Sequence, residues 1–180
     1  MKKFISILGS ASVLLASTGE AATWVGIETG IGSSDYKSAS DSIDVSWTGA
    51  IQAGVDLNQN WSVLAGVHMG SGSSVPRKEI GVITESEEEL DYRAVSLSLN
   101  RNFYLTDRQF LYASVGLNYN QTEVELRSVK TIDEDGIGYN LRAGWLFRLD
   151  QRFSVNVGLQ RLGMSDVDVN SANIGLMYRF

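Results

Sequence analysis

The only histidine of the chain, His68, precedes a serine-rich segment that holds Ser71, Ser73 and Ser74. A histidine beside a serine can act as the base for a nucleophilic hydroxyl, and an acidic group usually orients the imidazole. The pattern allows two interpretations: a lipid-modifying enzyme that uses His68, or an imidazole held by hydrogen bonds inside the protein. A lone histidine on a polar row favours the second, so we predict that the protein is not an enzyme.

Charged residues also recur on the polar side of the alternating pattern described below. This row includes Glu28, Asp56, Arg142, Arg148 and Arg179. We expect Glu28 and Arg142 near the middle of the fold and the other three together near one end. Enclosed charges pair because an unpaired buried charge is costly. The sequence therefore predicts a structural ion-pair network; the alternative is a narrow gated pore in which the pairs exchange partners.

Acidic residues gather in two runs, at positions 85–91 and 133–135. Such runs usually form a solvated surface. Divalent-cation binding is the alternative, because Ca²⁺ and Mg²⁺ prefer oxygen ligands, although no EF-hand spacing is present. The candidate interaction residues in the predicted long connections are Tyr36, Lys37, Arg77, Lys78, Glu87, Glu88 and Glu89.

Composition excludes several classes of site. The chain has no cysteine and one histidine, which removes disulfides, thiolate metal sites and the usual zinc sets. It carries 15 basic and 21 acidic residues, a net charge of −6. A chain without a basic stripe is a poor candidate for nucleic-acid binding. We expect no cofactor and no metal.

The N-terminus has the organisation of a secretory signal peptide. Lys2 and Lys3 precede a short apolar run, and small residues near Ala22 suit cleavage. The apolar run is too short to span a bilayer as a helix, which needs about 20 residues. We therefore assign residues 1–22 to the signal peptide and residues 23–180 to one domain.

The rest of the chain alternates between apolar and polar residues and shows no convincing helical spacing. Eight strands are predicted, at 24–33, 44–57, 61–70, 90–103, 110–121, 136–149, 153–162 and 173–180. Most approach the roughly 9–11 residues of a tilted transmembrane strand. Short connections follow the second, fourth and sixth strands, and long ones follow the first, third and fifth. This alternation is typical of an outer-membrane barrel with both termini in the periplasm.

Which row faces inward decides between a membrane barrel and a soluble one, because a soluble barrel encloses its apolar row. The polar row is rich in Gly, Ser and Asn and poor in Lys, which suits a packed, narrow lumen. Aromatic residues expected in a periplasmic girdle are Trp61, Phe103, Tyr104, Phe110, Phe147, Phe153 and Phe180. Arg101 and Arg161 share the lipid-facing parity, so we expect them at strand ends or beside a β-bulge.

These features resemble the small eight-stranded outer-membrane barrels of the OmpX/Ail type and the membrane domain of the OmpA type. The resemblance covers Thr23 to Phe180 and includes the segment 97–105, LSLNRNFYL. It implies an all-β fold, an eight-stranded antiparallel up-and-down transmembrane β-barrel, in the outer membrane of a Gram-negative bacterium. The last strand, with Tyr178 and Phe180, is similar to the signal that the barrel-assembly machinery reads. Family members serve as adhesins, serum-resistance proteins, envelope-integrity proteins and, occasionally, enzymes.

Together these expectations describe a monomeric, non-enzymatic barrel among outer-membrane lipids and lipopolysaccharide. Its extracellular loops are expected to bind a host or matrix protein or to support envelope integrity. Eight strands leave a lumen that side chains just fill, so we predict no stable conductance in planar bilayers. The ligand stays unassigned, because loops carry function without recurring local chemistry.

Overall fold

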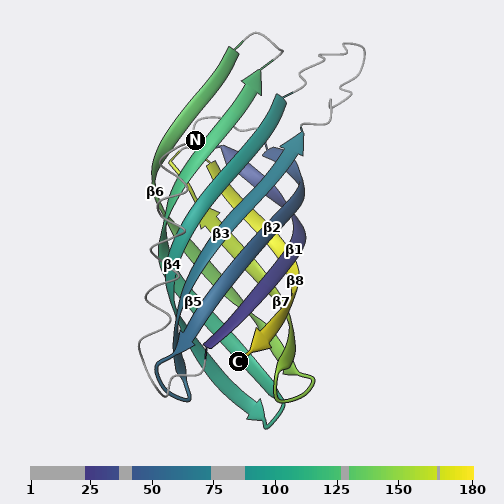
Figure 1. Cartoon of the computed structure of the whole chain (residues 1–180). Helices are drawn as coiled ribbons and strands as arrows, with labels where there is room; N and C mark the ends of the chain where they lie inside the picture. The colour runs from purple at the N-terminus through teal and green to yellow at the C-terminus, as the bar shows by residue number, and fades with distance from the viewer. Residues whose placement is uncertain (1–22, 37–41, 74–87, 127–129, 166) are drawn as a thin grey trace.

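The computed structural model describes residues 23–36, 42–73, 88–126, 130–165 and 167–180. They form β1 (Thr23–Tyr36), β2 (Ser42–Asp56), β3 (Trp61–Ser73), β4 (Glu88–Thr106), β5 (Gln109–Leu126), β6 (Lys130–Arg148), β7 (Phe153–Gly163) and β8 (Val167–Arg179). Each strand pairs antiparallel with the next, and β8 pairs with β1, which closes the barrel (Figure 1). The predicted fold class is confirmed.

The part of the chain that the structure describes holds no helix long and apolar enough to cross a membrane.

Several strands extend farther than the sequence predicts. β5 runs to Leu126 and β6 begins at Lys130, so the long connection expected at 122–135 is wrong and only 127–129 separate the two strands. The connection expected near 163–169 is also shorter, because β8 begins at Val167. The prediction stopped where the apolar row ends. The β5–β6 hairpin continues beyond the membrane into water. There its strands are held by backbone pairing and need no apolar, lipid-facing row, so the strands extend past the last apolar residues.

Most outward side chains are apolar, and most inward side chains in the middle of the barrel are polar, as predicted. Exposed outward residues include Ile27, Ile51, Leu97, Leu117, Ile137 and Leu159, and buried inward residues include Gln52, Ser62, Ser98, Asn118, Asn140 and Asn156. In hydrocarbon, every backbone polar group must find its partner within the protein. The closed ladder supplies those partners, and the outward row supplies the apolar surface.

Large aromatic rings inside and outside the wall lie over glycines of the adjacent strand. Tyr92 is directly opposite Gly70, and a Cβ added to that glycine would lie 2.6 Å from the Tyr92 ring. Tyr139 covers Gly163 in the same manner. The absence of a side chain lets the ring lie flat on the backbone, so ring and glycine specify the register together.

The turns at the periplasmic end are closed by side chains. The Oδ1 atom of Asn58 accepts hydrogen bonds from the backbone N–H groups of Asn60 and Trp61, at 2.9 and 3.0 Å. Asp150 Oδ1 does the same for Arg152 and Phe153, both at 2.7 Å. Asn and Asp favour such turns because the side-chain oxygen replaces a backbone acceptor. These two N–H hydrogen bonds hold the pKa of Asp150 below its ordinary value, because they stabilise the carboxylate.

The aromatic girdle forms at this end with two corrections. Phe103, Phe147, Phe153 and Phe180 are exposed on the outer wall. Tyr104 has the inward parity of β4 and is 51% exposed at the end of the barrel, where its hydroxyl donates to the Gln59 carbonyl. Phe110, also expected there, is instead 3% exposed inside the barrel. Its parity is that of the inward row of β5, and its ring packs edge-on against Tyr104, with 4.6 Å between centroids.

Arg101 and Arg161, which both point outward, lie near strand ends, one of the two placements expected for them. Arg101 is in register with Trp61, the first residue of β3, and its guanidinium lies 5.2 Å from the Trp61 ring centroid and 5.0 Å from that of Phe103. Arg161 is two residues from the end of β7. Arginine at such a depth reaches the interface at little cost.

Candidate functional site: the layered lumen and the extracellular rim

A buried ion pair lies in the middle of the lumen. The Nη2 atom of Arg142 on β6 pairs with Oε1 of Glu28 on β1, and the two side chains are 6% and 5% exposed. Gln52 on β2 bridges them: it accepts from Arg142 Nη1 at 2.6 Å and donates to Glu28 Oε2 at 3.1 Å. Asn156 on β7 donates to Glu28 Oε1 at 2.7 Å. The structure thus brings together the two central charges that the sequence singled out.

The ion pair is closed from one side by an aromatic ring. The guanidinium carbon of Arg142 lies 5.6 Å from the centroid of Tyr112, within the range of a cation–π contact. The Tyr112 hydroxyl lies where a Cβ on Gly144 or Gly158 would be, so both positions exclude a side chain. The layer formed by Glu28, Arg142, Gln52, Asn156 and Tyr112 is therefore closely packed and its two charges are paired, with about 50 Å³ of free space beneath it.

At the periplasmic end of the lumen, the expected three-residue cluster separates into two parts. Arg179 Nη2 lies 3.0 Å from Asp56 Oδ2, and Ser62 donates to Asp56 Oδ1 at 2.8 Å. Arg148 instead lies over the Phe110 ring, 4.8 Å from its centroid. Among the described residues no carboxylate comes within ion-pair distance of Arg148. The inward Phe110, which the sequence analysis placed outside, provides its partner.

His68 does not meet Ser71 or Ser73, and Ser74 lies outside the described residues. Ser71 and Ser73 have the outward parity of β3, whereas His68 points inward and is 3% exposed. Its Nε2 atom lies 2.8 Å from Ser96 Oγ on β4, and its Nδ1 atom lies 3.2 Å from Gln160 Nε2 on β7. The pairing with these serines, which the enzymatic alternative required, is therefore absent, and His68 is the hydrogen-bonded interior imidazole of the favoured interpretation. Ser96 was missed because it is distant in sequence and only the β3–β4 register brings it close.

The hydrogen bonds around His68 assign its tautomer. Gln160 Nε2 also donates to Asn140 Oδ1 at 2.9 Å, and its Oε1 accepts from Asn173 at 3.4 Å, which fixes the orientation of the amide. Nδ1 of His68 thus accepts a hydrogen bond from Gln160, and the protonated Nε2 donates a hydrogen bond to Ser96 Oγ. A histidine that donates to a serine is not acting as its base, so this pair lacks the arrangement of an activated nucleophile.

An apolar plug fills the extracellular end of the lumen. It consists of Leu90, Tyr92, Ala94, Leu162, Met164, Val167 and Val169, all at most 4% exposed. This cluster differs from the expected inward row, which was polar throughout. The signal was present in β4, where positions 90, 92 and 94 are all apolar and share the inward parity. The lumen is therefore polar in its middle and apolar at its extracellular end.

Three of the predicted interaction residues lie at the same end. Lys37, Arg77, Lys78 and Glu87 fall outside the described residues. Tyr36 ends β1, and Glu88 and Glu89 begin β4, so these three belong to strands rather than to the loops in which they were expected. Within the described chain, no group of three or more His, Cys, Asp or Glu side chains is arranged to hold a metal ion.

At and above the level of the plug, β4, β5 and β6 form a raised wall. These strands have 19, 18 and 19 residues, against 11 in β7, and rise above the other strands in Figure 1. Asp91 is opposite Glu123, which is opposite Asp133, so carboxyl-bearing residues occupy one row across three strands. β6 pairs with β5 over its whole length but with β7 only from Tyr139, so its upper part is an edge of the described sheet.

The C-terminal residues close the barrel. The Phe180 N–H donates to the Thr23 carbonyl at 2.9 Å, and the Phe180 side chain is 74% exposed. The Tyr178 ring packs edge-on between Phe153 and Phe180, at centroid distances of 5.2 and 5.1 Å. An exposed terminal aromatic in this girdle agrees with the predicted assembly signal, which itself stays a prediction.

Solved structures with the same fold include several small outer-membrane proteins. Neisserial surface protein A aligns with a TM-score of 0.66 and 13% identity, covering 88% of this chain and 97% of its own. The protein OprG of Pseudomonas aeruginosa aligns at 0.60 and 14%, covering 90% and 98%. The attachment invasion locus protein Ail of Yersinia pestis, in complex with the heparin analogue sucrose octasulfate, aligns at 0.59 and 15%, covering 89% and 99%. At these identities the likeness shows the fold alone.

A search of curated proteins found no match to this sequence. The family described as the outer membrane protein beta-barrel domain matches residues 5–180, nearly the whole chain. The closed eight-stranded barrel, its apolar outer wall and its polar interior agree with that match. The chain therefore belongs to the outer membrane protein beta-barrel domain family and is an integral protein of the outer membrane.

Proposed function

We propose that this barrel is a non-enzymatic surface-interaction protein and that the raised wall of β4, β5 and β6 is its binding surface. The lumen supports this assignment by exclusion. A paired, hydrogen-bonded layer and an apolar plug fill the interior, and the only histidine donates to its neighbouring serine. Chemistry or transport through the lumen has no support among the described side chains, whereas the wall is exposed and charged.

The observation that carries the proposal is the row of acidic residues across three adjacent strands. Like charges directly opposite one another in a sheet destabilise it. Asp91 and Glu123 are exposed neighbours in this row, and Asp135 is exposed in the next row. A cationic partner would relieve that repulsion. The upper edge of β6 offers such a partner backbone groups for strand pairing.

The partner we propose is therefore an extended, lysine- or arginine-rich segment of a host or matrix protein. Ail was solved with a sulfated heparin analogue, which is a polyanion. The wall of this chain has the opposite preference, because its carboxylates would repel sulfate groups. The shared fold thus supports a surface role without the same ligand.

Attachment of expressing cells to an immobilised lysine-rich peptide and to immobilised heparin tests the proposal. The triple variant Asp91→Asn/Glu123→Gln/Asp135→Asn removes wall charges without touching the lumen. Wild-type cells should bind the peptide in a salt-sensitive way, and the variant should bind about tenfold less. The matched control is Asp150→Asn, at the periplasmic end, which should bind as wild type does. Equal binding by the triple variant, or preference for heparin, would contradict the proposal.

A further inference from the structure

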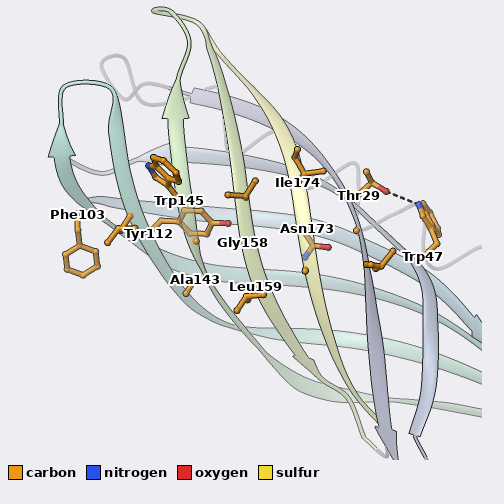
Figure 2. A pocket seen from close by; sticks show the side chains of 16 residues that line it. Thr29, Trp47, Phe103, Tyr112, Ala143, Trp145, Gly158, Leu159, Asn173 and Ile174 are labelled. Carbon is orange, nitrogen blue, oxygen red and sulfur yellow. Dashed lines mark hydrogen bonds between the residues drawn. The ribbon is translucent and has the colours of Figure 1, made fainter.

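The lipid-facing wall is hollowed on one side of the barrel. One hollow, with a volume of about 1090 Å³, lies over β6, β7, β8 and β1, and its edges reach residues of β2, β4 and β5 (Figure 2). Its floor consists of small residues, Gly30, Ala143, Gly144, Gly158 and Ala172, and its sides of large ones, Trp47, Phe103, Leu111, Trp145, Leu159 and Ile174. We call this hollow, with its extension described next, the wall trough.

The trough continues toward the extracellular end. A second hollow of about 580 Å³ shares Ile31, Ala143, Leu159 and Ala172 with the first and reaches Arg161. Along β7, Val157 lines the first hollow and Arg161 lines the second. These two residues are four positions apart, or about 13 Å at roughly 3.3 Å per residue. The wall trough is thus an elongated apolar depression with one arginine at its upper rim.

Two partners hold Arg161 in place at that rim. Its Nη2 atom lies 2.6 Å from Asp168 Oδ2, and its Nε donates to the Tyr139 hydroxyl at 3.1 Å. The side chain is still 47% exposed, and Nη1 has no partner among the described residues. Arg161 therefore presents an oriented donor to the outside, at the head of an apolar depression.

The location of the wall trough decides what fills it. An empty depression forfeits dispersion contacts, and water against apolar side chains inside a bilayer would lose hydrogen bonds. Hydrocarbon chains are the material available at this depth. A chain lying in the trough with its polar end upward would place its headgroup beside Arg161, and guanidinium groups bind phosphate particularly well.

We propose that the wall trough binds one molecule of lipopolysaccharide, with an acyl chain over Ala143 and Ala172 and a lipid A phosphate at Arg161. The rim lies at the extracellular end of β7, on the side of the outer leaflet, where lipopolysaccharide is the phosphorylated lipid. The site is separate from the raised wall of β4, β5 and β6, so it does not depend on the proposed function.

Native mass spectrometry of protein refolded with purified lipopolysaccharide tests the site. Wild type should retain one molecule. Arg161→Gln should weaken retention about tenfold, because it removes the charged donor to phosphate. Ala143→Leu/Ala172→Leu, which fills the floor with apolar atoms and keeps the wall lipid-compatible, should weaken it as much.

Matched controls separate binding from folding. Arg101→Gln removes another outward arginine, at the periplasmic end, and Ala65→Leu enlarges an outward alanine outside the trough. Both should retain lipopolysaccharide as wild type does. Each variant should keep the gel mobility of a folded barrel, so that a loss of lipid is not a loss of fold.

Four other results would overturn the proposal. Equal retention of dephosphorylated lipid A would remove the role of Arg161, and equal retention of phosphatidylglycerol would make the site a general phospholipid site. A dimer lost in Ala143→Leu/Ala172→Leu would assign the trough to a second copy of the chain. Retention that stays unchanged in every variant would show that the trough has no bound lipid of its own.

Discussion

Breaking the Glu28–Arg142 pair should be the most damaging single change in the lumen. In Arg142→Met, the carboxylate of Glu28 keeps its hydrogen bonds from Gln52 and Asn156 but loses its counter-charge in an enclosed site. Removing one partner of a buried ion pair costs about 3–5 kcal/mol. That corresponds to at least about a hundredfold change in the equilibrium constant of unfolding.

The double variant Glu28→Gln/Arg142→Met distinguishes a pair effect from lost packing. It removes both charges, so no uncompensated charge stays buried. Replacing a buried pair by neutral residues of similar size is often close to neutral. We therefore expect the double variant within about 1–2 kcal/mol of wild type, and a coupling energy of at least about 2 kcal/mol between the two sites.

Equilibrium urea unfolding in lipid vesicles, followed by tryptophan fluorescence, measures these free energies. Arg148→Met is the control, because Arg148 stacks on Phe110 and pairs with no carboxylate among the described residues. It should cost about 1 kcal/mol, the size of a cation–π contact. If Glu28→Gln and Arg142→Met each cost less than that, or if the double variant costs their sum, the pair does not hold the lumen together.

Three further predictions concern the lumen, a turn and the wall. Purified protein in planar bilayers should show no stable conductance, since a plug and a paired layer fill the lumen; reproducible large channels would contradict this. The lowered pKa of Asp150 means that it stabilises the folded state above the unfolded-state pKa of about 3.9 and loses that contribution as the pH falls through its folded pKa. The stability difference between wild type and Asp150→Asn should therefore shrink in acid, and a constant difference from pH 7 to pH 2 would refute the assignment. Gly163→Val should slow or prevent folding, because its side chain would overlap the Tyr139 ring, whereas Tyr139→Ala/Gly163→Val should recover folded protein on gels.

Much of the fold could be predicted because the membrane requires every strand to alternate outward apolar residues with inward polar ones. Alternation at Ile174, Leu176 and the residues that follow, together with the loop lengths, was sufficient for strand number, orientation and closure. Strand ends were less predictable, because the hairpin of β5 and β6 continues into water, where no lipid-facing row marks it. The error at 122–135 follows directly from using apolar residues as the boundary.

The interior was predictable only where charge demanded a partner. Glu28 and Arg142 are the charges nearest mid-barrel on the inward row. Because both are buried, they are expected to form an ion pair with each other. Arg148 was misassigned because its partner, Phe110, was read as a girdle residue. His68 was linked to serines near it in sequence, whereas strand register places it beside Ser96. Contacts between strands depend on register, which a single sequence specifies weakly.

We claim that the apolar row faces lipid and the polar row is enclosed. Labels at neighbouring positions on β5 distinguish this arrangement from its inverse. The chain has no cysteine, so single cysteines at Val115, Leu117, Ser114 and Asn118 can carry nitroxide labels without background. We predict that oxygen, which concentrates in hydrocarbon, relaxes the labels at Val115 and Leu117 strongly, and that neither oxygen nor a water-soluble nickel complex reaches those at Ser114 and Asn118. Strong nickel contact at Asn118 with a shielded label at Leu117 would describe an inverted, soluble barrel and would contradict the claim.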